Sequence, residues 1–388
     1  MTVAYPIAHA WLSAGGTGAQ NYDEFADDAE ITAIIAANPS SALAIEMPHR
    51  APDNVGRSFT DSLPDAVSRL QAAKDAGHYT AADDVVVLYR ITSPDGARAY
   101  GLWCMVATDQ ISTSADEPGA VIRNEDVFIE KVRERVALAE ATRHLLSPVL
   151  LLQTAHGEAL HAAIAQAVTH AGSPAVTDVD PAGRSHEIWA VGAGTTRDRL
   201  LALAGGGELV VADGNHRSLA AQTAGYPRFL AVVTTPESVA IQPYNRLVSE
   251  LPGDVSFGGT ALDAAEVPAS GGRVHLYTRD GAWSVELPRD ADGGVIDNLD
   301  HALVERRLFA ETLGLDPGDK RITYVGGDYP ASWLRDEVDA GRAELAVLIA
   351  PVTVDDFVAV NLARQKMPRK STWFTPKARA GLVVAQLS

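Results

Sequence analysis

The residues best suited to chemistry stand together in the stretch Asp213-Gly-Asn-His-Arg. The apolar run 209–212 before it predicts a buried strand, and a helical pattern opens at His216. A strand that turns into a helix at Asp-Gly gathers backbone N–H groups and the positive end of the helix dipole at one point. We therefore predict a phosphate cradle with binding residues Asp213, Gly214, Asn215, His216 and Arg217, in which Asp213 also serves a metal or a hydroxyl.

An ordinary helix start accounts for the same stretch in another way. An aspartate or asparagine at that place commonly caps a helix for about 1 kcal/mol. His216 and Arg217 would then be plain first-turn residues. Cations at a helix N-terminus oppose the dipole, so two basic residues there favour an anion between them. The sequence leaves both interpretations open.

A second basic stretch, residues 365–377, stands out in a strongly acidic chain. Pro368 and Pro376 disfavour a helix there, so the segment is predicted to be a stiff loop. One interpretation is a second anion-contacting loop, and the other is a surface patch that pairs with acidic side chains. In the first interpretation the donors are Lys370, Ser371, Thr372 and Lys377.

Acidic residues that could move a proton occur in two places. Glu125 opens a helical pattern and is our candidate general base, with a solvated helix face as the alternative. Asp23 and Glu24 precede another helical pattern, where they are candidates for acid–base chemistry or Mg²⁺ binding, or merely form a turn. Arg246 is a candidate phosphate contact, with a structural ion pair as the alternative.

Composition limits the classes of function. The 388 residues carry a formal net charge of −18, which argues against nucleic-acid binding through a broad basic face. The single cysteine excludes an internal disulfide framework. No apolar run approaches the roughly 20 residues that span a bilayer, and the N-terminus has no secretory pattern. We expect a bacterial cytoplasmic protein with a small-molecule partner; whether it forms a homo-oligomer is left open.

Strand and helix patterns alternate irregularly along the chain, with several hairpins. The main predictions are a hairpin over 83–107, strands at 149–153, 184–191, 229–235 and 345–350, and helices at 61–76, 125–146, 156–171, 195–204 and 299–313. This mixture predicts an α+β fold rather than a doubly wound sheet. The segment 252–270, rich in Gly, Pro and Asp, suggests a core region over 1–255 and a C-terminal α+β region over 256–388 that ends in the basic loop.

Several motifs together resemble one family from end to end. Ala212-Asp-Gly-Asn-His-Arg resembles the Ala-Asp-Gly-His-His-Arg signature of the domain-of-unknown-function 1015 family. The stretch 367–377, Met-Pro-Arg-Lys-Ser-Thr-Trp-Phe-Thr-Pro-Lys, resembles the family's closing motif. Shorter likenesses lie at 21–25, 38–48, 123–126 with Arg135, 147–149 and 243–246.

This resemblance implies a ParB/sulfiredoxin-like nucleotide-binding core similar to that of kinases for free serine. It further implies phosphoryl transfer from ATP or ADP to a small hydroxyl substrate with Mg²⁺, with Asp213 and Asp23 as metal ligands. Glu125 or Glu24 would then be the base, and Asp213 would help to place metal or substrate. The basic residues, Arg246 included, would hold phosphates, since this chemistry mostly needs positioning and cationic clamping.

Three positions depart from the family pattern. Asn124, Asn215 and Asn245 stand where the family has histidine. Asparagine keeps hydrogen bonding but does not titrate near neutral pH. The sequence therefore supports two hypotheses: a small-molecule kinase, or a nucleotide- or phosphate-binding regulatory protein without turnover.

Overall fold

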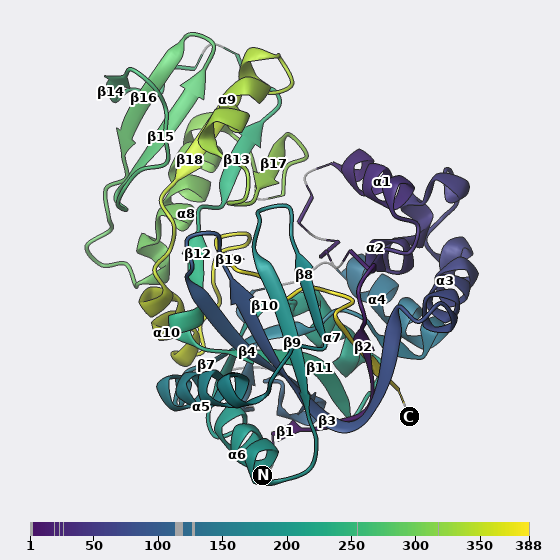
Figure 1. The fold of residues 1–388 in the computed structure, drawn as a ribbon. Coiled ribbons are helices and arrows are strands. Elements are labelled where there is room, and N and C mark those ends of the chain that lie inside the picture. The colour runs from purple at the N-terminus through teal and green to yellow at the C-terminus, as the bar shows by residue number, and fades with distance from the viewer. Residues whose placement is uncertain are drawn as a thin grey trace. The chain divides into compact units, whose positions relative to one another are not determined.

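The computed structural model describes residues 3–18, 20–22, 24–25, 27–112, 119–125, 129–253, 255–316 and 318–387, and they form two compact units (Figure 1). Unit 1 comprises Met1–Val239 and Pro376–Ser388, and unit 2 comprises Ala240–Thr375. Unit 2 is therefore one continuous segment between two parts of unit 1. The units divide at 239/240 and 375/376, whereas the domain boundary predicted from composition lies at 255/256.

Unit 1 is built on a mixed sheet, to which its described residues contribute 12 strands. The strand order is β5-β10-β7-β11-β4-β3-β2-β20-β6, while β1 pairs with β4, β9 with β3 and β8 with β9. The bounds are β1 Ala4–Tyr5, β2 Ile7–Ser13, β3 Tyr79–Thr92, β4 Arg98–Ala107, β5 Val121–Ile122, β6 His144–Leu145, β7 Val149–Gln153, β8 Val176–Val179, β9 Ser185–Val191, β10 Leu209–Asp213, β11 Arg228–Thr234 and β20 Val383–Gln386.

Helices cover this sheet in separate clusters. Side chains of α5 and α6, such as Leu160 and Leu200, pack into one core with the central strands, and α3 and α4 contribute Leu70 and Leu138 to another. The bounds are α1 Asp28–Ala37, α2 Ala42–Glu46, α3 Leu63–Asp75, α4 Ile129–Thr142, α5 Gly157–His170, α6 Thr195–Ala204 and α7 Asn215–Thr223, with short turns η1 Pro48–Arg50, η2 Pro52–Asn54, η3 Thr60–Ser62, η4 Thr108–Gln110 and η5 Pro236–Ser238.

In unit 2 the residues that the structure describes form a six-stranded antiparallel sheet in the order β14-β16-β15-β18-β13-β17, and a separate pair of strands, β12 and β19. Residues of β18 alternate between two cores: Leu345 and Val347 face the α8–η7 side, and Ala346 and Leu348 face α9. The bounds are β12 Ala240–Gln242, β13 Asn245–Val248, β14 Thr260–Leu262, β15 Arg273–Thr278, β16 Gly281–Glu286, β17 Ile322–Val325, β18 Leu345–Ile349, β19 Trp373–Thr375, η6 Ile296–Asn298, α8 Asp300–Leu303, η7 Val304–Leu313, α9 Ala331–Asp339 and α10 Val354–Leu362.

The predicted α+β class with mixed sheets is confirmed, but two helices differ from their predictions. The helix expected over 125–146 is α4, which ends at Thr142 because Arg143 has a left-handed φ of 57°. The Thr142 hydroxyl accepts the His144 N–H at 3.3 Å and so closes that end. The helix expected over 299–313 begins as α8 and continues as a π-helix over η7. Within the described ranges, no helix is long and apolar enough to cross a membrane.

Candidate functional site

The predicted cradle lies where β10 meets α7 in unit 1. Gly214 joins them with φ 97°, a left-handed conformation that disfavours other residues. A Cβ at this position would come within 3.2 Å of the Val149 Cα on the neighbouring strand. Glycine is therefore required twice over, for its backbone conformation and for the close approach. Helix α7 begins at Asn215, one residue earlier than the sequence pattern indicated.

Two charged residues of the predicted cradle, Asp213 and Arg217, form an ion pair with each other. Arg217 Nη2 donates to Asp213 Oδ2 at 2.8 Å, and the Arg217 Nη1 group donates to the Pro148 carbonyl. The Arg217 side chain is only 8% exposed. The Asp213 carboxylate is therefore an anionic partner of Arg217 within the turn itself. The alternative of an aspartate or asparagine N-cap is wrong, because the N-cap residue is Gly214.

Asn215 connects this turn to the segment that carries Glu125. The Asn215 amide donates to the Asn124 side-chain oxygen and accepts the Asn124 backbone N–H at 3.3 Å. Both asparagines are buried, while His216 and Glu125 are partly exposed. The structure therefore places Glu125 one residue from a direct contact with the start of α7. No sequence signal links positions 124 and 215 except that the resembling family has histidine at both.

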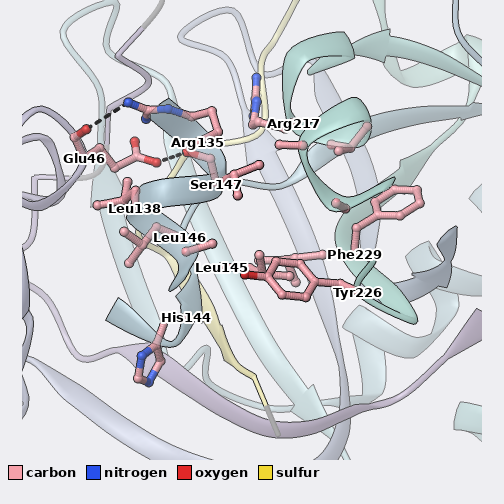
Figure 2. A pocket seen from close by; sticks show the side chains of 16 residues that line it. Glu46, Arg135, Leu138, His144, Leu145, Leu146, Ser147, Arg217, Tyr226 and Phe229 are labelled. Atoms are coloured by element: carbon pink, nitrogen blue, oxygen red, sulfur yellow. Dashed lines mark hydrogen bonds between the residues drawn. The ribbon is translucent and has the colours of Figure 1, made fainter. Parts of the chain in front are cut away.

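A small cavity lies behind the turn, between α4 and α7 (Figure 2). Glu46, Arg135, Ser147 and Arg217, which come from four of the resembling motifs, line its polar part. Ser147 donates to the Glu46 carboxylate, and Arg135 Nη2 donates to the Glu46 carbonyl at 3.2 Å.

The cavity measures about 50 Å³, enough for a few waters but far below the roughly 300–1,000 Å³ of ligand pockets. A cavity of this size does not enclose a nucleotide. Sequence reasoning included Glu46 and Ser147 only as parts of motifs. Nothing in their sequence separation of 101 residues indicated that these two side chains are hydrogen-bonded.

Glu24 is already committed to structural contacts. Its Oε2 accepts from Arg379 Nη1 at 2.8 Å, and its Oε1 accepts from Asn21 at 3.0 Å. Arg379 Nη2 donates in turn to Asp180 at 2.8 Å. Because both carboxylate oxygens have a hydrogen-bond partner, Glu24 anchors the C-terminal segment to the N-terminal part of unit 1. Asp23, the other predicted acidic residue here, lies outside the described residues.

Asp180 is the centre of this buried ion network. Burial alone would raise the pKa of Asp180, but hydrogen bonds from His186, Arg379 and Arg184 outweigh it and hold that pKa well below its usual range. The His186 ring nitrogen lies 3.1 Å from the Asp180 carboxylate. Lys377, two residues before Arg379, is buried at 8% exposure in the same unit.

Arg246 is fully buried in unit 2 and is used there as an ion-pair partner. Its guanidinium donates to Glu305 at 3.2 Å and to the Tyr244 carbonyl at 2.8 Å, and it stacks over the Tyr324 ring at 4.4 Å. Burial lowers the pKa of Arg246, and the charge of Glu305 opposes this shift. The structural ion pair, which the sequence offered as the alternative to a phosphate contact, is therefore present. Asn245 likewise has a structural contact, since its side chain accepts the Ile349 N–H at 3.0 Å.

The remaining predicted residues of the basic loop also belong to unit 2. Strand β19 pairs with β12, which brings this loop beside the stretch 242–246. The Lys370 ammonium lies 5.5 Å from the Tyr244 ring centre, and Trp373 meets the same ring edge-on at 5.4 Å. Ser371 is buried at 1% exposure, and Thr372 is partly exposed. Residues 243–246 and 370–373, which belong to two separate motifs in the sequence, are therefore in contact within unit 2.

Metal ligands do not gather anywhere in the part of the chain that the structure describes, where no three His, Cys, Asp or Glu side chains form a group able to hold an ion. Asp213 uses Oδ2 for Arg217. Mg²⁺ at phosphate sites is usually held by only one or two carboxylates together with the substrate phosphates.

Comparison with protein families gives one match, described as "Protein of unknown function (DUF1015)", over residues 9–302. The chain belongs to this family. The matched range includes the 213–217 turn, Asn124 and Arg246. A comparison with curated protein sequences gave no match.

Three solved structures illustrate what the chain is similar to. A free serine kinase in complex with AMP shares 11% identity at a TM-score of 0.40, covering 72% of this chain and 92% of the kinase. SbnI with a C-terminal truncation, from Staphylococcus aureus, shares 12% at 0.40, covering 72% and 87%. A conserved hypothetical protein from Pyrococcus furiosus shares 12% at 0.38, covering 72% and 95%.

Proposed function

We propose that this protein is a nucleotide-dependent phosphotransferase that acts on free serine or a similar small hydroxyl metabolite, with ATP or ADP as donor. The observation that carries the proposal is the Asn124–Asn215 contact, which holds the residue before the partly exposed Glu125 against the first residue of α7. A helix N-terminus attracts phosphate oxygens, and a carboxylate beside it is suited to take a proton from an attacking hydroxyl. The resemblance of the stretches 123–126 and 212–217 to the motifs of kinase-like relatives supports this assignment.

In this proposal each residue of the turn has one task. The first-turn N–H groups of α7 and the His216 ring hold the phosphates, and Gly214 allows the tight turn that leads from β10 into α7. Glu125 accepts the hydroxyl proton while the hydroxyl oxygen bonds to the terminal phosphorus and the bridging P–O bond breaks, releasing the shortened nucleotide. Arg217 acts indirectly, by holding Asp213 and the Pro148 carbonyl in place.

Mg²⁺, when bound, would neutralise charge on the phosphates, with Asp213 as its protein ligand. Lys370, Ser371, Thr372 and Lys377 stay predicted phosphate contacts. We also propose that unit 1 contains the ParB/sulfiredoxin-like core implied by the motifs, and that the protein works in the cytoplasm, where nucleotides are available.

The direct test is to incubate the protein with serine, Mg²⁺ and either ATP or ADP and to measure phosphoserine. We expect product from the wild type and loss of product in Glu125→Gln, which keeps the shape of the side chain but cannot take the proton. Absence of product with both nucleotides, across several hydroxy acids, would overturn the proposal.

A second candidate function is nucleotide binding without turnover. It is favoured by the internal pairing of Arg217 with Asp213 and by the non-titrating amides at 124 and 215. A thermal-shift titration run beside the transfer assay separates the two functions. Stabilisation by nucleotide with no transfer supports the binding protein, and no stabilisation by ATP or ADP rejects both.

A further inference from the structure

Two buried asparagines, 91 residues apart in sequence, meet beside the turn. Asn124 is 1% exposed and Asn215 is 5% exposed. Asn215 uses both ends of its amide on the same residue: its nitrogen donates to the Asn124 side chain, and its oxygen accepts the Asn124 backbone N–H at 3.3 Å. A side chain that binds both the backbone and the side chain of one residue fixes the position of that residue.

We propose that the Asn124–Asn215 pair is the joint that positions Glu125 at the start of α7, so that both asparagines are positioning residues. The inference rests on the proposed function for its catalytic consequence. Consecutive Cα atoms are about 3.8 Å apart, so a fixed backbone at Asn124 restricts where the Glu125 side chain can reach. Misplacing a catalytic group by about 1 Å can cost about 100-fold in rate.

The pair has a direction, because the Asn215 nitrogen donates and the Asn124 side-chain oxygen accepts. An aspartate at 124 keeps that acceptor. An aspartate at 215 removes the donor and sets two acceptors against each other. The helix dipole alone predicts the opposite order, since an acid is favoured at the first residue of a helix, which is position 215. Which of the two variants is impaired more therefore distinguishes the hydrogen-bonded joint from a simple charge effect.

The experiment compares Asn124→Asp and Asn215→Asp in two measurements on the full chain. Hydrogen exchange of the 121–125 amides should stay slow in N124D and become faster in N215D. In the transfer assay, N215D should lose at least about tenfold more kcat than N124D, while the added carboxylate raises the nucleotide KM in both variants. A difference in kcat between two variants that add the same charge at the same contact marks positioning rather than charge repulsion.

Leucine variants keep the proposal testable if an aspartate prevents folding. A double-mutant cycle uses Asn124→Leu, Asn215→Leu and the double variant. The double variant should lose no more kcat than N215L, because the two residues share one interaction. Additive losses, or equal exchange in N124D and N215D, would overturn the joint. Absence of transfer in the wild type would instead overturn the proposed function, while the exchange result still decides whether the joint exists.

Discussion

At the scale of single residues, the structure shows different neighbours for the two glutamates that the sequence offers as general bases. Glu24 is bound by Arg379 and Asn21, whereas Glu125 lies next to the Asn124–Asn215 contact. Both were candidate bases because both precede a helical pattern. Their difference comes from Arg379, which lies 355 residues away from Glu24 along the chain, so no local pattern could reveal it.

We predict that Glu24→Gln mainly lowers stability and that Glu125→Gln mainly lowers kcat. E24Q removes a charge from the Arg379 network and should lower the free energy of unfolding by about 1–3 kcal/mol, with transfer largely kept. E125Q should reduce kcat at least about 100-fold, the size of a general-base contribution. Urea unfolding and the phosphoserine assay measure the two effects. Loss of transfer in E24Q with full activity in E125Q would reverse the assignment.

The Asp213–Arg217 ion pair gives a second prediction at this scale. Asp213→Asn keeps the shape of the side chain but leaves the buried Arg217 guanidinium without its carboxylate, which should cost about 1–3 kcal/mol of stability. Asp198→Asn, at an exposed ion pair in α6, is the control and should change stability by less than about 1 kcal/mol. Equal effects in urea unfolding would show that the pair does not hold the turn together.

At the scale of elements, apolar periodicity predicted some segments well and missed others. The run 149–153 is strand β7, and 195–204 is helix α6, because each carries a clear pattern with nearby turn residues. Strand β20 was not predicted, since its place between β2 and β6 depends on pairing with distant strands. The anion cradle was predicted as a strand–turn–helix, but its internal ion pair was not, although Asp213 and Arg217 have helical i,i+4 spacing.

Helix α8 carries a buried histidine that makes stability depend on pH. Burial, reinforced by the charge of Arg246, lowers the pKa of His301 to about 3, and burial also lowers the pKa of His49 to about 4. The unfolded chain therefore binds protons between about pH 3 and 6.5 that the folded chain does not, so stability falls as pH drops through this window. His301 alone should account for roughly 2 kcal/mol between pH 7 and 5.

The matched variant is His301→Gln, which can still donate to the Tyr244 carbonyl that lies 3.3 Å from the ring nitrogen. The loss of stability from pH 7 to pH 5 should be smaller in H301Q than in the wild type. Urea unfolding at the two pH values provides the measurement. An unchanged pH dependence would show that His301 does not stay neutral in the folded chain.

At the scale of the whole molecule, the chain leaves unit 1 at residue 239 and returns at 376. The returning segment supplies β20, which pairs with β2 and β6, and Arg379, which binds Glu24 and Asp180. Composition suggested a boundary near the Gly- and Pro-rich stretch 252–270. It could not indicate the return, because residues 376–387 reveal their partners only in the folded sheet.

We predict that truncation after Thr375 destabilises unit 1 as a whole rather than only its edge. The truncated chain loses a buried strand and leaves Asp180 without the Arg379 guanidinium, so hydrogen exchange should become faster in β2 and β3. Truncation after Gln386 should leave this protection unchanged. Equal protection in both truncated proteins would contradict the account of the returning segment.

The central claim is that nucleotide phosphate binds at the 213–217 turn. The most direct measurement is calorimetric titration of ATP and ADP against wild type, Gly214→Ala and Gly225→Ala. Both glycines have positive φ, 97° and 68°, but a Cβ meets neighbouring atoms only at 214. The account predicts that G225A binds like wild type and that G214A loses at least about tenfold in affinity, about 1.4 kcal/mol. Equal affinity in all three proteins, or no binding by the wild type, would contradict it.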